Sequence, residues 1–380
     1  MNNESNTFKD LGINDAFTEA LASLTITSPT AVQNKVIPAL HEGKSVIFQS
    51  ETGTGKTFAY LLPLLQKIDT SKKDTSILIV APTHELASQI KAQVQSISSI
   101  KTALCIGGAS IKRQVETLKE KPLIVIGGPV RLIELIHLKK LKITNLTSAV
   151  FDEADRLLAP EMRDDTIALV SMIPKEAQIA ACSATMKKSL SDALHLAAAR
   201  EMESIELPLE DVLKKKITHI ALFSEQRDKI DTLRSFLAAE KPQKALIFTS
   251  KLDQVSLIVS RLQAKQVDCQ GLHAKSDKIE RKQAIDRFKS GKLSILVTSD
   301  LSSRGLDITD ITHIIQMDVP SNDDFFIHRA GRTARAGKEG CNVVIGDGWE
   351  LRQLAKLEKK LGFIVYPKQL SSGKLLDPLL

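Results

Sequence analysis

Short apolar runs recur along the chain at regular intervals, and polar stretches of helix length separate them. In the first half these runs are Val46–Phe48, Ile77–Val80, Ala103–Ile106, Leu123–Ile126, Ala149–Phe151 and Ile179–Cys182. In the second half they are Ile217–Phe223, Ala245–Phe248, Cys269–Leu272, Ile295–Val297, His313–Met317 and Asn342–Ile345. Apolar runs of strand length that alternate with helices are typical of a parallel sheet covered on both faces. The pattern predicts an α/β protein whose two series of strands form two related lobes.

The stretch between the two series reads ELPLEDVLKKK, from Glu206 to Lys216. Its proline, mixed charges and basic run are typical of a linker. We therefore predict a first domain over residues 1–206, a linker over 207–216 and a second domain over 217–365. An amphipathic helix is predicted from Trp349, and a short tail is predicted over 366–380.

Distinctive residues follow the strand-like runs of the first half. They are PTHELA after Val80, two glycines after Ile106, GGPVR after Ile126, DEAD after Phe151 and SAT after Cys182. Ligands of parallel α/β sheets bind at the carboxyl ends of the strands. These strand ends therefore predict a binding site along one edge of the first sheet.

The stretch Val46–Tyr60, VIFQSETGTGKTFAY, has the order strand, glycine loop, Lys-Thr and helix. This order is typical of a phosphate-binding loop. Glycines let backbone N–H groups point at phosphate oxygens, and the helix N-terminus adds positive charge. Lys56 would reach the β- and γ-phosphates, and the Thr57 hydroxyl would ligate Mg²⁺. The alternative is an ordinary strand–turn–helix junction, because Ser50 stands where the usual pattern has Gly or Ala.

Two adjacent carboxylates follow the run that ends at Phe151. Asp152 can hold Mg²⁺ through a water molecule, and Glu153 can position and deprotonate an attacking water. An acidic surface turn is the alternative. Phosphoryl transfer also needs positive charge near the γ-phosphate, for which Arg332 and Arg335 are candidates. The alternative for these two arginines is a basic turn on the surface.

Composition narrows the class of partner. The net charge is +7 and the pI is about 9.0, which favours a polyanionic partner. Only 4 % of residues are aromatic, so contacts to a nucleic-acid backbone would dominate over base stacking. Four cysteines lie far apart without a CxxC pair, which argues against a zinc site or a disulfide framework. The apolar runs are too short for a membrane span, and the polar N-terminus lacks a signal-peptide pattern, so we expect a cytoplasmic protein.

With these motifs in order along residues 8–337, the chain resembles the DEAD-box RNA helicases. The resemblance implies two tandem RecA-like domains, each a mostly parallel sheet flanked by helices. It implies that ATP, with Mg²⁺, and RNA bind across the cleft of the two domains. It also implies RNA-stimulated ATP hydrolysis that unwinds short RNA duplexes locally and non-processively, or that remodels ribonucleoprotein complexes.

The resemblance assigns ATP-site roles to residues of this chain, position by position. Phe8 would stack on adenine, the Gln33 amide would read the adenine edge, and Asp307 would bind the ribose. The remaining ATP-binding positions would be Ser50, Thr52, Gly53, Thr54, Gly55, Lys56, Thr57, Arg332 and Arg335. The catalytic set would be Lys56, Asp152, Glu153, His328, Arg332 and Arg335, with Thr57 and Asp152 at the metal.

The resemblance also assigns RNA and coupling roles. RNA-backbone contacts would come from Pro82, Thr83, Gly108, Pro129, Arg131, Ser299 and Asp300. Ser183 and Thr185 would couple hydrolysis to strand separation through hydrogen bonds near Asp152 and Asp155.

Four positions depart from the family's usual residues. His84 stands in place of Arg, Gly128 in place of Thr, and Val130 and Ala334 each in place of Gly. A histidine is largely neutral at pH 7, so a permanent charge is missing from the predicted RNA track. We expect a weaker or altered grip on RNA, whereas the hydrolytic residues are intact.

Three functions remain open: an RNA helicase, an ATP-dependent RNA clamp or scaffold, and a DNA helicase or translocase. The SPTAVQ segment at residues 28–33 and the DEAD tetrapeptide argue against the DNA enzyme. The sequence after the last strand-like run is too short for a separate RNA-binding module, so a near-minimal core is expected. We expect a monomer that acts on RNA, and among its roles we favour ribosome assembly, with pre-ribosomal particles as partners.

Overall fold

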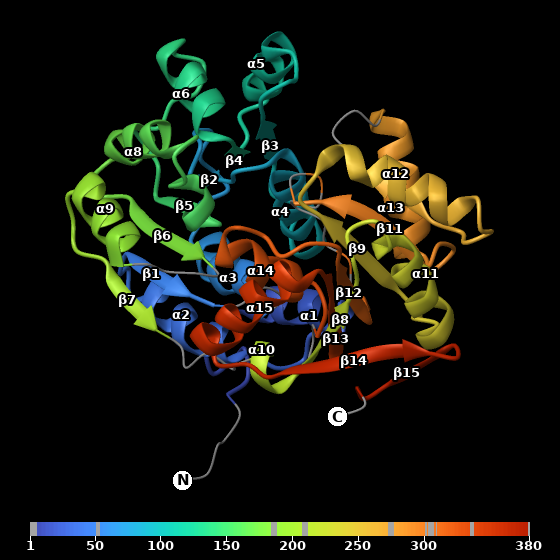
Figure 1. Cartoon of the computed structure of the whole chain (residues 1–380). Helices are drawn as coiled ribbons and strands as arrows, with labels where there is room; N and C mark the ends of the chain where they lie inside the picture. The colour runs from blue at the N-terminus through green and yellow to red at the C-terminus, as the bar shows by residue number, and fades with distance from the viewer. Residues whose placement is uncertain are drawn as a thin grey trace. The chain divides into compact units, whose positions relative to one another are not determined.

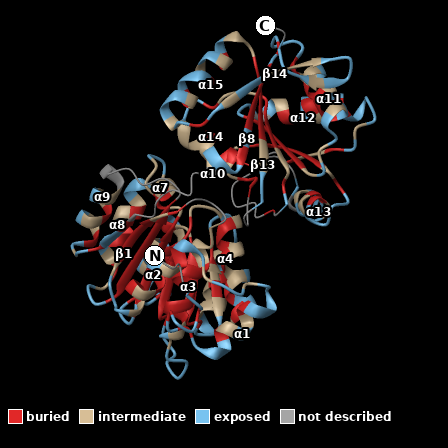
Figure 2. Ribbon diagram, turned by 90° about the horizontal axis from the view of Figure 1, so that it is seen from below, coloured by how far each residue is buried: buried red, intermediate tan, exposed pale blue. Residues whose placement is uncertain are grey.

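The computed structural model describes residues 6–50, 54–183, 188–206, 212–272, 277–300, 302, 308, 310–334 and 338–378. The chain forms two compact units, Met1–Pro208 and Leu209–Leu380 (Figure 1). In each unit the buried residues concentrate in the strands, and the exposed residues lie on helices and loops around them (Figure 2). Within the described part of the chain, no helix has the length and apolar character that crossing a membrane requires.

The first unit is built on a seven-stranded sheet with the order β3-β4-β2-β5-β6-β1-β7, and its neighbouring strands are parallel. Its strands are β1 (Val46–Gln49), β2 (Ile77–Val80), β3 (Thr102–Cys105), β4 (Ile124–Gly127), β5 (Ser148–Asp152), β6 (Gln178–Ser183) and β7 (Glu203–Glu206). Its helices are α1 (Asp15–Ser23), α2 (Ala31–His41), α3 (Lys56–Gln66), α4 (His84–Ile97), α5 (Ile111–Lys119), α6 (Pro129–His137), α7 (Ala154–Leu157), α8 (Arg163–Met172) and α9 (Lys188–Ala198).

Successive side chains of each strand enter two different hydrophobic cores, one on each face of the first sheet. Val46 and Phe48 of β1 pack in the core that α1 to α4 cover, whereas Ile47 packs in the core that α6 to α9 cover. Both faces are therefore buried, and strands buried on both faces read as continuous apolar runs. This is why the sequence pattern predicts these strands.

The second unit is built on an eight-stranded sheet with the order β10-β11-β9-β12-β13-β8-β14-β15. Its strands are β8 (Ile217–Phe223), β9 (Ala245–Thr249), β10 (Gln270–Leu272), β11 (Ile295–Ser299), β12 (His313–Gln316), β13 (Gly340–Gly346), β14 (Val365–Ser371) and β15 (Lys374–Leu376). The pair β14–β15 is antiparallel, and the other neighbours are parallel. Its helices are α10 (Val212–Lys215), α11 (Lys229–Glu240), α12 (Leu252–Gln263), α13 (Lys278–Lys289), α14 (Asp323–Ala330) and α15 (Gly348–Leu361).

The two sheets repeat one strand order. Strands β1 to β7 of the first unit occupy the same places, in chain order, as β8 to β14 of the second. Helix α3, which follows β1, therefore has α11, which follows β8, as its counterpart. The prediction of an α/β chain with two related lobes is confirmed.

Edge elements differ from the sequence prediction. Residues 366–380, predicted as a short tail, contain most of β14, which pairs with β8, and all of β15. The predicted linker contains the short helix α10, and β7 was not predicted. These segments are short or half-exposed, so they carry no continuous apolar run. The domain ranges 1–206 and 217–365 stay predictions.

Candidate functional site

The loop after β1 brings Ser50, Thr54 and Lys56 together. The Ser50 and Thr54 hydroxyls lie 2.5 Å apart, and the Lys56 ammonium donates to the Ser50 carbonyl at 2.5 Å. Gly55 has a φ of +89°, and a Cβ there would lie 2.6 Å from Gln33 Nε2, so this position requires glycine. Ser50 is buried, so a small side chain fits where the usual pattern has Gly or Ala. Thr52 and Gly53 lie outside the described residues.

Gln33 connects the start of α2 to this loop. Its Oε1 accepts from the Thr30 N–H in a capping box, and its Nε2 donates to the Gly55 carbonyl at 3.1 Å. A glutamine amide has two N–H donors and two lone pairs on its oxygen. One donor and one lone pair therefore remain for an adenine edge. Phe8, by contrast, is only 1 % exposed and packs in the core beside α2 and α3, so the structure leaves little of its ring for a base.

Asp152 is the last residue of β5, and it is buried. Its Oδ2 accepts from the Tyr60 hydroxyl at 2.8 Å. Its Oδ1 accepts from the Glu153 N–H at 2.8 Å and from the Cys182 thiol at 3.1 Å. Burial raises the pKa of Asp152 above its ordinary value, and the neighbouring Lys56 charge opposes this shift.

Glu153 has an unusual backbone conformation. Its φ of 50° and ψ of 53° lie in the left-handed region, which is uncommon for residues other than glycine. Such conformations cluster at functional sites, where surrounding structure holds them in place. The Glu153 carboxylate lies 3.5 Å from the Arg156 guanidinium one turn later, so a charged partner orients it.

Thr57 and Asp152 have the chemistry that a magnesium ion needs. Among the residues that the structure describes, no group of three or more His, Cys, Asp or Glu could hold a metal ion by itself. Mg²⁺ usually takes one or two carboxylates and completes its shell with phosphate oxygens and water. The Thr57 hydroxyl and the Asp152 carboxylate, bridged by Tyr60, fit that requirement.

Ser183 and Asp155 flank this site. Ser183 ends β6 beside β1, and its carbonyl accepts from the Ser50 N–H at 3.0 Å. Asp155 lies in the first turn of α7, where its carboxylate accepts from the Arg156 N–H at 3.0 Å. Thr185 lies outside the described residues.

The residues predicted to contact RNA in the first unit follow β2, β3 and β4. Thr83 caps α4 by accepting from the Leu86 N–H, and Pro82 precedes it. Gly108 has a φ of +73°, and Pro129 is the first residue of α6. These strands are neighbours in the sheet and parallel, so their carboxyl ends lie along one edge. The structure thus brings these residues to one edge of the first unit.

The Arg131 side chain is bonded to other groups of the first unit. Its guanidinium donates to the Ala109 carbonyl and the Gln114 amide oxygen at 3.1 and 2.9 Å, and it pairs with Glu134 at 2.8 Å. These bonds fix the loop that carries Gly108 against α6.

Of the departures from the family's usual residues, two in the first unit are exposed, and the one in the second unit has a strained backbone. His84 is exposed at the start of α4, and Val130 is 59 % exposed in the first turn of α6. Ala334 has a φ of 56°, a conformation that glycine adopts without strain. Gly128 precedes α6 as its N-cap residue.

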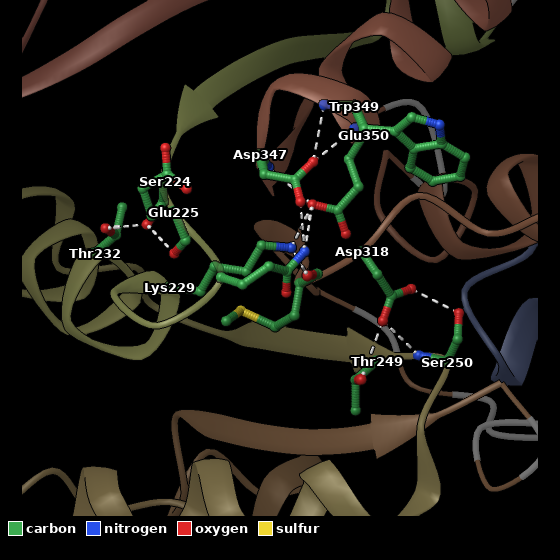
Figure 3. A network of polar contacts seen from close by, with 12 residues as sticks. Ser224, Glu225, Lys229, Thr232, Thr249, Ser250, Asp318, Asp347, Trp349 and Glu350 are labelled. Carbon is green, nitrogen blue, oxygen red and sulfur yellow. Dashed lines mark hydrogen bonds and ion pairs between the residues drawn. The ribbon is translucent and has the colours of Figure 1, made fainter.

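In the second unit, Ser299 ends β11, Asp300 follows it, and Arg329 of α14 reaches Asp300. Arg329 forms two hydrogen bonds with Asp300, and it also contacts Asp318 and Ser250. Asp318 in turn accepts from the Thr249 hydroxyl and from Ser250 (Figure 3). Sequence reasoning missed Arg329 and Asp318; an arginine and carboxylates at neighbouring strand ends were the available signal.

His328 lies on α14 and Arg332 follows just after this helix, and both residues are buried. Asp307 and Arg335 lie outside the described residues.

The counterpart of Lys56 in the second unit is Lys229, because each is the first residue of the corresponding helix. The Lys229 ammonium is nearly buried and pairs with Glu350 at 2.6 Å, and it donates to the Met317 carbonyl at 2.7 Å (Figure 3). An internal carboxylate therefore neutralises this lysine. In the second unit the lysine at this position forms an internal ion pair, whereas Lys56 lies beside a candidate ligand site.

Two family descriptions match the chain. Residues 30–193 match the DEAD/DEAH box helicase family, and residues 228–337 match the helicase conserved C-terminal domain. The DEAD-box ATP-dependent RNA helicase CshC of Bacillus cereus is 38 % identical over 355 residues, which cover 92 % of this chain and 90 % of the relative. The probable ATP-dependent RNA helicase YfmL of Bacillus subtilis is 37 % identical over 350 residues, which cover 91 % of this chain and 92 % of the relative.

Solved structures share the fold. Mss116 bound to single-stranded RNA and AMP-PNP matches with a TM-score of 0.85 and 28 % identity, over 100 % of this chain and 81 % of that chain. Dbp5 of S. cerevisiae bound to RNA and ADP BeF3 matches with a TM-score of 0.86 and 23 % identity, over 96 % of each chain. The prediction of two RecA-like domains is confirmed.

Proposed function

Because the chain belongs to the DEAD-box ATP-dependent RNA helicase family, we propose that it couples RNA-stimulated ATP hydrolysis to local, non-processive unwinding of short RNA duplexes. The observation that carries the proposal is the arrangement at the strand ends of the first unit. There the positive charge of Lys56 lowers the pKa of the buried Asp152 carboxylate, against the effect of burial. Glu153, whose backbone is strained, is the next residue in the chain. A lysine, a metal-binding carboxylate and a base at one edge are what hydrolysis of a nucleoside triphosphate needs.

In this proposal, residues of the first unit hold the nucleotide. Lys56 and the N–H groups at the start of α3 neutralise the phosphates, and the remaining donor and acceptor of Gln33 read adenine. Thr57, and Asp152 through water, would hold Mg²⁺, which would supply charge neutralisation at the phosphates.

Glu153 is the proposed general base. Its carboxylate takes a proton from the attacking water, and Arg156 orients that carboxylate from 3.5 Å away. Arg332 and Arg335 are proposed to stabilise the negative charge that develops on the γ-phosphate, and His328 to link this step to bound RNA.

RNA is proposed to bind through its backbone. The proposed contacts to the RNA backbone in the first unit come from Pro82, Thr83, Gly108 and Pro129. Those in the second unit come from Ser299 and Asp300. The low aromatic content and the charge of +7 favour phosphate and ribose contacts over base stacking. Arg131 supports this track through its bond to the Ala109 carbonyl.

The alternative is an ATP-dependent RNA clamp, in which ATP-bound closure is the function and strand separation is not. Release of a labelled strand from a short RNA duplex separates the two. A helicase releases the strand with ATP and turns over, whereas a clamp retains RNA and releases no strand at any ATP concentration. Equal stimulation of ATP hydrolysis by DNA and RNA would favour a DNA translocase instead.

We further propose that the protein acts as a monomer in the cytoplasm, with pre-ribosomal particles as substrates. Crosslinking of the ATP-bound Glu153→Gln protein to cellular RNA tests the substrate. Recovery of ribosomal RNA precursors supports the proposal, and recovery of messenger RNA alone contradicts it.

A further inference from the structure

Tyr60 lies between the two residues proposed to hold magnesium. It is in the second turn of α3, and none of its surface is exposed. Its hydroxyl is 2.8 Å from Asp152 Oδ2, and the Thr57 side chain is within hydrogen-bonding reach of the same hydroxyl. No role for this side chain follows from the phosphate loop or from the DEAD residues themselves.

The partners of Asp152 leave its carboxylate little freedom to rotate. Oδ2 accepts from Tyr60, and Oδ1 accepts from Glu153 N–H and from the Cys182 thiol. With Asp152 only 4 % exposed, water cannot easily replace a lost donor. Both lone pairs of Oδ1 are thereby used, whereas Oδ2 keeps one lone pair that can accept from a metal-bound water.

The Thr57 hydroxyl poses a second requirement. When a hydroxyl ligates a metal ion it gives a lone pair to the metal, and its proton must point to another acceptor. The Tyr60 oxygen can accept that proton while its own proton is donated to Asp152. In that arrangement, a chain of bonds from Thr57 to Tyr60 to Asp152 would leave the Thr57 lone pairs for the metal ion.

We propose that Tyr60 is a positioning residue for magnesium, which orients both the Thr57 hydroxyl and the Asp152 carboxylate through its single hydroxyl group. The inference rests on the proposed function, because that function supplies the magnesium ion. A simpler reading is that a buried tyrosine has found the nearest acceptor. The two readings differ in one measurable respect, because only a positioning role changes the dependence of nucleotide binding on Mg²⁺.

The test uses the full chain and a fluorescent ADP analogue. Binding is measured in EDTA and across a Mg²⁺ titration, for wild type and Tyr60→Phe. Loss of a bond that orients a metal ligand typically costs ten- to a hundredfold in metal affinity, so the Mg²⁺ concentration for half-maximal effect should rise about tenfold. Binding in EDTA should stay within about twofold of wild type, because the phenyl ring keeps the packing of α3.

Tyr366→Phe is the matched control, because Tyr366 is the other of the two tyrosines and lies half-exposed on β14. This variant should match wild type in both conditions. In a Thr57→Ala background, Tyr60→Phe should have a smaller effect on the Mg²⁺ titration, since the two residues act through one chain of bonds.

An unchanged Mg²⁺ titration for Tyr60→Phe overturns the inference while leaving the proposed function intact. Equal weakening with and without Mg²⁺ also overturns it, since that is the mark of a purely structural role. A wild-type protein that binds the nucleotide equally well in EDTA and in Mg²⁺ overturns the magnesium assignment of the proposed function as well.

Discussion

Arg329 donates two hydrogen bonds of 2.6 Å to Asp300, one to each carboxylate oxygen. The arginine side chain is 1 % exposed, and it also pairs with Asp318 at 3.1 Å. Burial alone would raise the pKa of Asp318, but the Arg329 charge and the Ser250 hydrogen bonds outweigh burial and lower it. Arg329 therefore ties α14 to the ends of β11 and β12.

Replacing Arg329 should strongly destabilise the second unit. Arg329→Met removes the charge and leaves two largely buried carboxylates, Asp300 and Asp318, without their cationic partner. Breaking a buried ion pair in this way costs about 3–5 kcal/mol in the free energy of unfolding. Urea unfolding, followed by the fluorescence of the sole tryptophan, Trp349, measures the loss.

Arg227→Met is the matched control for that experiment. Arg227 pairs with Asp228 at 3.3 Å, but the two side chains are 85 % and 57 % exposed. An exposed pair contributes little, so this variant should change the free energy of unfolding by less than about 1 kcal/mol. Equal losses for the two variants would refute a special role for the buried cluster.

His219 should make the stability of the second unit depend on pH. Its Nε2 donates to the Leu213 carbonyl at 2.8 Å, and its Nδ1 accepts from the Asn342 amide. Burial lowers the pKa of His219 from 6.5 to about 4, so the unfolded chain binds a proton that the folded chain does not. The stabilisation is complete above pH 6.5 and is lost as the pH falls toward 4.

Going from pH 7 to pH 5 should therefore remove about 2 kcal/mol of unfolding free energy through His219 alone. Carboxylates also titrate in this range, so the variant His219→Gln isolates the effect of the histidine. Its amide does not titrate, and its pH dependence should be weaker than that of wild type by about this amount. Identical pH dependence of the two proteins would show that His219 does not behave as a buried neutral imidazole.

Gln33→Ala should lower the affinity for ATP more than the affinity for GTP. The remaining donor and acceptor of the Gln33 amide match an adenine edge. Such a pair of hydrogen bonds favours adenine over guanine by about tenfold or more. Equilibrium binding of the two nucleotides measures the ratio, and Gln95→Ala, an exposed glutamine on α4, is the control. If both nucleotides weaken equally, the amide serves only to hold the Gly55 carbonyl.

His84→Arg should strengthen RNA binding and make it more sensitive to salt. The added charge would lie exposed at the start of α4, among the strand ends proposed to form the RNA track. One more phosphate contact steepens the dependence of the logarithm of affinity on that of salt concentration by about 0.7 for single strands. Ala92→Arg, exposed farther along the same helix, is the control. A steeper slope for both variants would indicate general attraction rather than a contact at position 84.

Most of the fold was predictable from sequence because its strands are buried on both faces. The run Ile77–Val80 is apolar at every position and coincides with β2. Strand β14 reads VYPKQLS, with Pro367 and Lys368, and lies largely half-exposed near the sheet edge. Edge strands need only one apolar face, so a search for continuous runs misses them.

The site was predictable where its residues are adjacent in sequence and unpredictable where they meet only in space. Lys56 and Thr57 share a motif with the glycines, and Asp152 and Glu153 are neighbours. Tyr60 and Asp152 are 92 positions apart, and Arg329 and Asp300 are 29 apart. No local pattern reports such pairs, and a tyrosine in α3 reads simply as part of an apolar helix face.

RNA is expected to drive ATP hydrolysis at Asp152 and Glu153. Steady-state ATP hydrolysis, with and without RNA, by wild type and Glu153→Gln tests it most directly. We expect a low rate for wild type that rises with RNA, and a rate at least about a hundredfold lower in the variant, which still binds ATP. A wild-type rate that RNA leaves unchanged, or a variant that hydrolyses ATP normally, would contradict the account.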